Sequence, residues 1–154
     1  MKFCGLRSAR SRVSPTSDGR LARLWILLAS LNSVEAEHQA TIAVLDRIRE
    51  PIILPIPAIT EVAYLLARDI GNDAAADFIS SLADTELILE APLAEDYLRS
   101  AEILRQYADA HLDFVDALIA ATAERLNIKQ LLTLDRRDFQ LIRPKHCGSF
   151  ELLP

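Results

Sequence analysis

The chain has few of the residues that interrupt regular structure or build covalent and metal frameworks. Only four of its 154 residues are Gly and seven are Pro, while 51% are hydrophobic, so one globular domain rich in helices and strands is expected. Cys4 and Cys147 have no metal-ligand spacing and form no disulfide framework, which fits a reducing cytoplasm. The three scattered histidines argue against a zinc site. No apolar run approaches the ~20 residues that span a bilayer, so no membrane partner is expected.

The net charge of −5 is unevenly distributed along the chain. Residues 1–23 hold six of the 17 basic residues and one of the 22 acidic residues, so the remainder has a net charge of −10. An acidic body argues against broad electrostatic binding to nucleic acid. It is compatible with a nuclease that holds phosphates through metal ions bound to its acidic residues.

Residues 1–19 lack periodicity and are predicted to form a flexible basic arm, with a single domain over residues 20–154. The basic start, followed by the apolar run 24–31, also has features of a signal or transit peptide. That run is short, so we favour an arm that leads into a buried helix.

Helical and strand patterns alternate along the domain. Leu98, Ala101 and Leu104 are expected to face inward on one of these helices. Such alternation, with strands apolar on both faces, predicts a three-layer α/β/α fold with a mostly parallel central sheet, whose site lies at the carboxyl ends of the strands. Helices are predicted over residues 26–31, 34–49, 58–69, 73–82, 94–107 and 114–127, and strands over 51–54, 86–89, 130–134 and 149–152.

Three carboxylates, Glu61, Asp116 and Asp135, lie in or just after apolar runs. Burying an isolated carboxylate is costly, so those kept in such places usually share a cation or a catalytic task. Glu61 has apolar neighbours three and four residues away on its helix face. The alternative is that Glu61 only complements the helix dipole.

Asp113 and Asp116 stand at the start of a predicted helix. Asp113 is a natural N-cap, and Asp116 then occupies the third helical position, from which a carboxylate can point past the helix end. It is equally consistent with the sequence that both only stabilise the helix N-terminus.

Asp135 follows the strand ending at Leu134, in the run Asp135-Arg136-Arg137-Asp138-Phe139. Asp135 is preferred to Asp138 because Phe139 indicates that the chain re-enters the core there. Arg136 and Arg137 are candidates for holding phosphates, although a solvated turn explains them as well.

Together, Ile59-Thr60-Glu61-Val62, Asp116-Ala117-Leu118-Ile119 and Thr133-Leu134-Asp135 resemble the acidic motifs of PIN-domain ribonucleases, especially VapC-type toxins. The resemblance covers roughly residues 27–154. It implies a PIN-like fold and an endoribonuclease that hydrolyses RNA phosphodiesters with Mg²⁺ or Mn²⁺. Glu61, Asp116 and Asp135 would be its catalytic metal ligands, Asp113 a second-choice ligand, and Arg136 and Arg137 contacts to RNA. It also implies a cognate antitoxin and a homodimer.

The chain departs from the family pattern at position 23. The family's first strand ends there in an aspartate, whereas this chain has Arg23, and residues 18–22 are a poor candidate for a central strand. One explanation is a frame shift in the gene: Arg23-Leu24-Trp25 encoded as CGA-CTC-TGG reads Asp-Ser-Gly one nucleotide later. The other is that the Arg23 guanidinium replaces the cation, which would leave an inactive PIN-like module that still binds an antitoxin.

Overall fold

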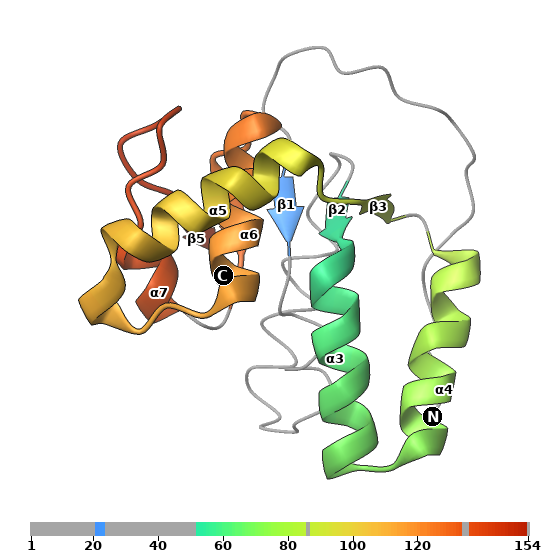
Figure 1. Cartoon of the computed structure of the whole chain (residues 1–154). Helices are drawn as coiled ribbons and strands as arrows, with labels where there is room; N and C mark the ends of the chain where they lie inside the picture. The colour runs from blue at the N-terminus through green and yellow to red at the C-terminus, as the bar shows by residue number, and fades with distance from the viewer. Residues whose placement is uncertain (1–20, 24–51, 86, 134–135, 154) are drawn as a thin grey trace.

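The computed structural model describes residues 21–23, 52–85, 87–133 and 136–153 (Figure 1). The predicted arm over residues 1–19 and the predicted helices over 26–31 and 34–49 lie outside these ranges. No helix in the described ranges is long and apolar enough to cross a bilayer. The strands are β1 (Leu21–Arg23), β2 (Ile52–Pro55), β3 (Ile88–Glu90), β4 (Gln130–Leu132) and β5 (Glu151–Leu153). The α-helices are α3 (Ile56–Asp69), α4 (Asn72–Ser81), α5 (Ala94–Gln106), α6 (Phe114–Arg125) and α7 (Arg136–Leu141), with short 3-10 turns at Leu82–Asp84 and Ala108–Ala110.

The five strands form one sheet in the order β3-β2-β1-β4-β5, and every pairing is parallel. The predicted parallel sheet is therefore confirmed. The prediction that this part of the chain is a poor candidate for a central strand was wrong, because Leu21–Arg23 forms that strand. Leu21 pairs with Ile52 of β2, and Arg23 pairs with Leu132 of β4. Pairing on both sides supplies the backbone hydrogen bonds that override a weak local preference for strand.

Most predicted elements are present within one or two residues of the expected bounds. α3 begins two residues early, since Pro57 is well suited to a first helical turn. α4 begins after Gly71, whose φ of 134° is closed to most L residues. α7 is the exception: Arg136 and Arg137, for which a solvated turn was the alternative, begin a helix that was not predicted.

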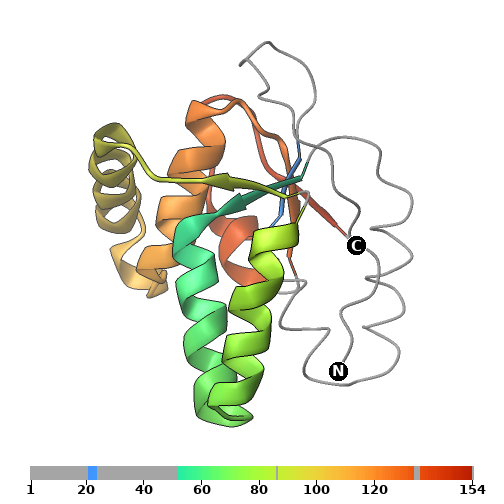
Figure 2. The same cartoon turned by 90° about the vertical axis from the view of Figure 1, so that its right-hand side faces the viewer.

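α6 lies at the centre of the main core, because every residue from Asp116 to Ala123 is buried. Its small alanine side chains let α5 pack closely along it, on the side away from the sheet (Figure 1). α3 continues from β2 and forms a hairpin with α4 that projects beyond the sheet (Figure 2). This hairpin has a smaller core of its own, made of Val62, Leu66, Ala75 and Phe78.

Candidate active site at the carboxyl edge of the sheet

The candidate carboxylates belong to segments that meet the carboxyl edge of the sheet. β2 passes directly into α3, which carries Glu61 (Figure 2). α6 precedes β4 and covers the sheet, so its first turn, with Asp116, lies at the edge where β4 ends. α3 and α6 are in contact. The structure therefore places the helices of Glu61 and Asp116 side by side at the edge where parallel sheets bind ligands.

Glu61 is half-buried in the second turn of α3, and its Oε2 atom is shielded from solvent. The residues that flank its helix face include the buried Ala58 and Val62. Tyr64 was expected in the same apolar setting but is exposed, with the Arg68 guanidinium 5.8 Å from its ring centre. Glu61 thus lies at the boundary of the core.

Asp113 and Asp116 have different surroundings, as the helix start predicted. The Val115 backbone N–H donates to Asp113 Oδ1 at 2.6 Å, so Asp113 is the N-cap of α6 and is exposed. Asp116 occupies the third helical position and is only 5% exposed, with its Oδ1 atom shielded from solvent. A carboxylate this buried is more than a surface complement to the helix dipole.

Asp135 lies outside the described residues, so its position relative to Glu61 and Asp116 stays a prediction. The residues on either side of it are described. Thr133 is buried and donates its N–H to the Leu153 carbonyl at 2.9 Å, which ties the end of β4 to β5. Arg136 and Arg137 begin α7 and are exposed.

Asp138 is a buried carboxylate that the sequence did not favour. It is 9% exposed, and its Oδ1 atom has no hydrogen-bond partner among the described residues. Phe139 and Ile142 are buried as well, and the apolar Ile142 four residues later is the signal that could have revealed the burial of Asp138. The alternative of a solvated turn is therefore wrong for Asp138, and Phe139 returns to the core as predicted.

The donor atoms at this edge suit a hard divalent cation. Glu61, Asp116 and Asp138 supply only carboxylate oxygens, the ligands that Mg²⁺ and Mn²⁺ prefer. The unpartnered Asp138 oxygen is the kind of buried atom that a nearby cation or water satisfies. Among the described residues alone, no three acidic, His or Cys side chains are grouped closely enough to hold one ion. A complete site would need a residue outside these ranges, and Asp135 lies three residues beyond the end of β4.

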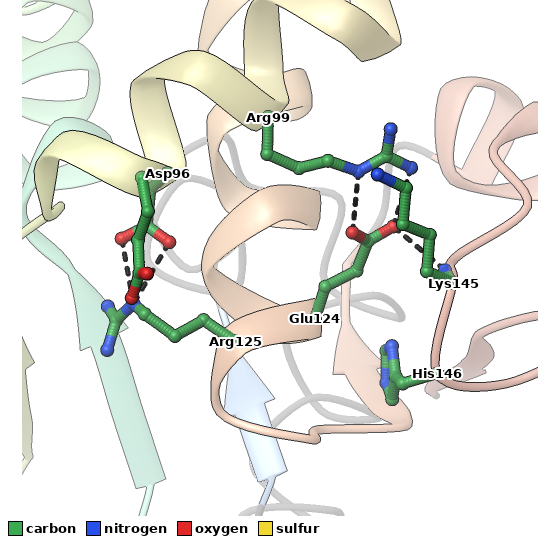
Figure 3. A pocket seen from close by; sticks show the side chains of 7 residues that line it. Asp96, Arg99, Glu124, Arg125, Lys145 and His146 are labelled. Carbon is green, nitrogen blue, oxygen red and sulfur yellow. Dashed lines mark hydrogen bonds and ion pairs between the residues drawn. The ribbon is translucent and has the colours of Figure 1, made fainter.

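A hollow of about 360 Å³ lies elsewhere, between α5, α6 and residues 145–146 (Figure 3). Its charged groups pair with one another: Arg99 Nε lies 2.7 Å from Glu124 Oε2, and Arg125 Nε lies 2.9 Å from Asp96 Oδ1. Burial alone would raise the pKa of Glu124, but hydrogen bonds from Arg99 and from the Lys145 backbone hold that pKa below its ordinary value. We interpret the hollow as the mouth of a structural ion-pair network.

Known proteins place this fold in a family. The model of the PIN domain matches residues 20–143. Ribonuclease VapC26 of Mycobacterium tuberculosis is 30% identical over 128 residues, which are 83% of this chain and 95% of that protein. Among solved structures, Mycobacterium tuberculosis VapC20, a sarcin–ricin loop cleaving toxin, has a TM-score of 0.65 at 20% identity, over 72% of this chain and 86% of its own. VapBC2 from Rickettsia felis, bound to a DNA fragment from its promoter, has a TM-score of 0.63 at 15% identity, over 86% and 96% of the two chains. On this evidence, the chain belongs to the PIN-domain family.

Proposed function

We propose that this chain is the toxin of a toxin–antitoxin pair and a metal-dependent endoribonuclease that hydrolyses RNA phosphodiesters. The observation that carries the proposal is the buried Asp116 carboxylate at the start of α6, beside the helix that bears Glu61. Similarity to Ribonuclease VapC26 and to a toxin that cleaves the sarcin–ricin loop supports the reaction class. Similarity to toxin–antitoxin complexes supports an antitoxin as partner.

Glu61, Asp116 and Asp135 would hold Mg²⁺ or Mn²⁺, and Asp113 remains a second-choice ligand. When bound, such a cation neutralises phosphate charge and lowers the pKa of the water that it holds. The chain's own task is to fix the oxygen donors in place. Burial at the third position of α6 restricts the rotamers of Asp116. The position of Glu61 on α3, at the boundary of the core, restricts the rotamers of Glu61 in the same way. We place the protein in the cytoplasm as a homodimer, with the antitoxin covering this edge.

The test is cleavage of RNA by the whole chain with Mg²⁺ or Mn²⁺ and with EDTA. Asp116→Asn and Glu61→Gln should each lower cleavage roughly 10²- to 10³-fold, because each removes charge from the centre that stabilises the transition state. Asp73→Asn is the matched control, since Asp73 is an exposed carboxylate in the first turn of α4 and has no part in the proposed site. Cleavage that persists in both Asp116→Asn and Glu61→Gln would refute this site.

A second function, an inactive module that only binds an antitoxin, is favoured by the position of Arg23. β1 is the central strand, and Arg23 is its last residue, between β2, which leads to Glu61, and β4, which leads to Asp135. A permanent guanidinium at this position would compete with a cation for the carboxylates. Arg23→Asp should then increase Mn²⁺ affinity in calorimetry by at least tenfold, whereas tight Mn²⁺ binding by the unaltered chain would exclude the inactive module.

A further inference from the structure

The outer face of α7 presents positive charge next to the carboxyl edge of the sheet. Arg136, Arg137 and Gln140 are exposed on this face, while Asp138 and Phe139 point inward. Asp138 is the only acidic residue between positions 136 and 150, and it is buried. The exposed side of this segment is therefore basic, although the chain as a whole has a net charge of −5.

Two arginines of this segment, Arg137 and Arg143, carry a positive charge that no carboxylate of the described residues neutralises. In the described part of the chain, the ion pairs involve Arg68, Arg99, Arg125 and Lys145 but neither Arg137 nor Arg143. Arg136 is a poorer candidate, because its Nη2 atom lies 3.5 Å from the Leu152 carbonyl oxygen and is directed toward β5.

Arg143 is held in place without losing its charge. Its Nη1 atom donates to the Gln140 carbonyl at 2.6 Å, and its backbone N–H donates to Tyr107 Oη at 2.9 Å. Carbonyl acceptors fix the guanidinium but leave its full positive charge and its remaining donors available. A cation fixed in advance loses less side-chain entropy when it binds an anion, which distinguishes Arg143 from a mobile surface arginine.

We propose that Arg137 and Arg143 bind successive phosphates of the RNA strand as it leaves the carboxyl edge along α7. The inference rests on the proposed function, because RNA is the ligand that brings phosphates to this edge. Arg137 lies near the start of α7, and Arg143 lies two residues beyond its end at Leu141, so the two guanidinium groups can contact different phosphates of one strand. The exposed charged side chains of residues 136–150 are all basic, so this segment attracts a phosphate chain although the chain as a whole is acidic.

Fluorescence anisotropy of a labelled single-stranded RNA, titrated with the whole chain in EDTA, tests binding without cleavage. Arg137→Gln and Arg143→Gln should each weaken binding roughly three- to tenfold, and each should reduce the slope of log K against log salt by about 0.7. Lys129→Gln is the matched control, because Lys129 is an exposed cation just before β4, at the opposite edge of the sheet. Its affinity and slope should equal those of the unaltered chain.

Arg143→Lys is the control for loss of binding through a folding defect. It keeps the positive charge and should retain most of the RNA affinity. Binding by Arg137→Gln equal to that of the unaltered chain, or an equal loss in Lys129→Gln, would overturn the proposal.

A cleavage assay on the same proteins separates the two proposals. RNA binding that depends on Arg137 and Arg143, without cleavage, would refute catalysis and keep the phosphate contacts. Cleavage with binding insensitive to both substitutions would refute the contacts and keep catalysis.

Discussion

Arg125 joins three elements, and its removal gives a quantitative test of what holds α6 in position. Its Nε atom lies 2.9 Å from both carboxylate oxygens of Asp96 in the first turn of α5 (Figure 3). Its Nη2 atom lies 2.8 Å from Glu90 Oε1 at the end of β3. Asp96 is 1% exposed. Arg125→Met keeps the length and the apolar stem of the side chain but leaves Asp96 as a buried charge without its cation.

Breaking a buried ion pair from one side costs about 3–5 kcal/mol in the free energy of unfolding. The lower end applies here, because the Arg125 side chain is 17% exposed and the Leu93 N–H still donates to Asp96 Oδ2 at 2.8 Å. For a domain of this size, about 1 kcal/mol changes Tm by roughly 2–4 °C. A loss of about 3 kcal/mol should therefore lower Tm by roughly 6–12 °C.

Urea denaturation of Arg125→Met, Asp96→Asn and the double variant completes the cycle. The double variant should be more stable than Arg125→Met, because it no longer contains a stranded buried charge. Arg68→Met is the matched control, since the Arg68–Asp69 pair is exposed and its loss should cause no measurable change. If Arg125→Met behaved like this control, or if the double variant were the least stable, the ion-pair network would not hold these elements together.

Three further predictions concern the same framework. Burial alone would raise the pKa of Glu124, but Arg99 and the Lys145 backbone hold that pKa below its ordinary value of 4.5. Ionised Glu124 should therefore contribute less to stability as pH falls below 4.5, and the urea midpoint of Glu124→Gln should change less with pH in that range. Gly71→Ala has free space but a φ of 134°, so it should lower the free energy of unfolding by roughly 1–3 kcal/mol; an unchanged urea midpoint would contradict the strain. Asp113→Ala should cost about 1 kcal/mol and Asp113→Asn close to nothing, whereas equal losses in denaturation would exclude the N-cap as the cause.

Elements set by local signals were predictable from the sequence. Asp113 was identified as the N-cap of α6, and the hydrogen bond from Val115 confirms it. The strand that begins at Gln130 was recognised from its apolar run, although it ends at Leu132, two residues early. These signals act within a few residues, so they do not depend on the rest of the fold.

Elements set by long-range contacts were not predictable. Leu98 was expected to face inward on α5, but it is 71% exposed, and the buried face consists of Asp96, Ser100 and Ile103. Hydrophobic periodicity misleads here because Asp96 is paired with Arg125, which lies 29 residues further along the chain. An ion pair can therefore turn the polar side of a helix toward the core, and no pattern within α5 reveals its partner.

The central strand shows both limits, and it bears on the proposed function through position 23. Leu21–Arg23 is too short and too weakly apolar to be recognised alone, yet it pairs with β2 on one side and β4 on the other. The backbone of position 23 pairs with Leu132 at the end of β4, so this position adjoins the carboxyl edge of the sheet, where ligands bind in parallel sheets. A positive charge at that position opposes cation binding, whereas a carboxylate there would add a ligand. The exchange of Arg23 for Asp is therefore the single substitution in this chain that should shift it most strongly toward metal-dependent cleavage.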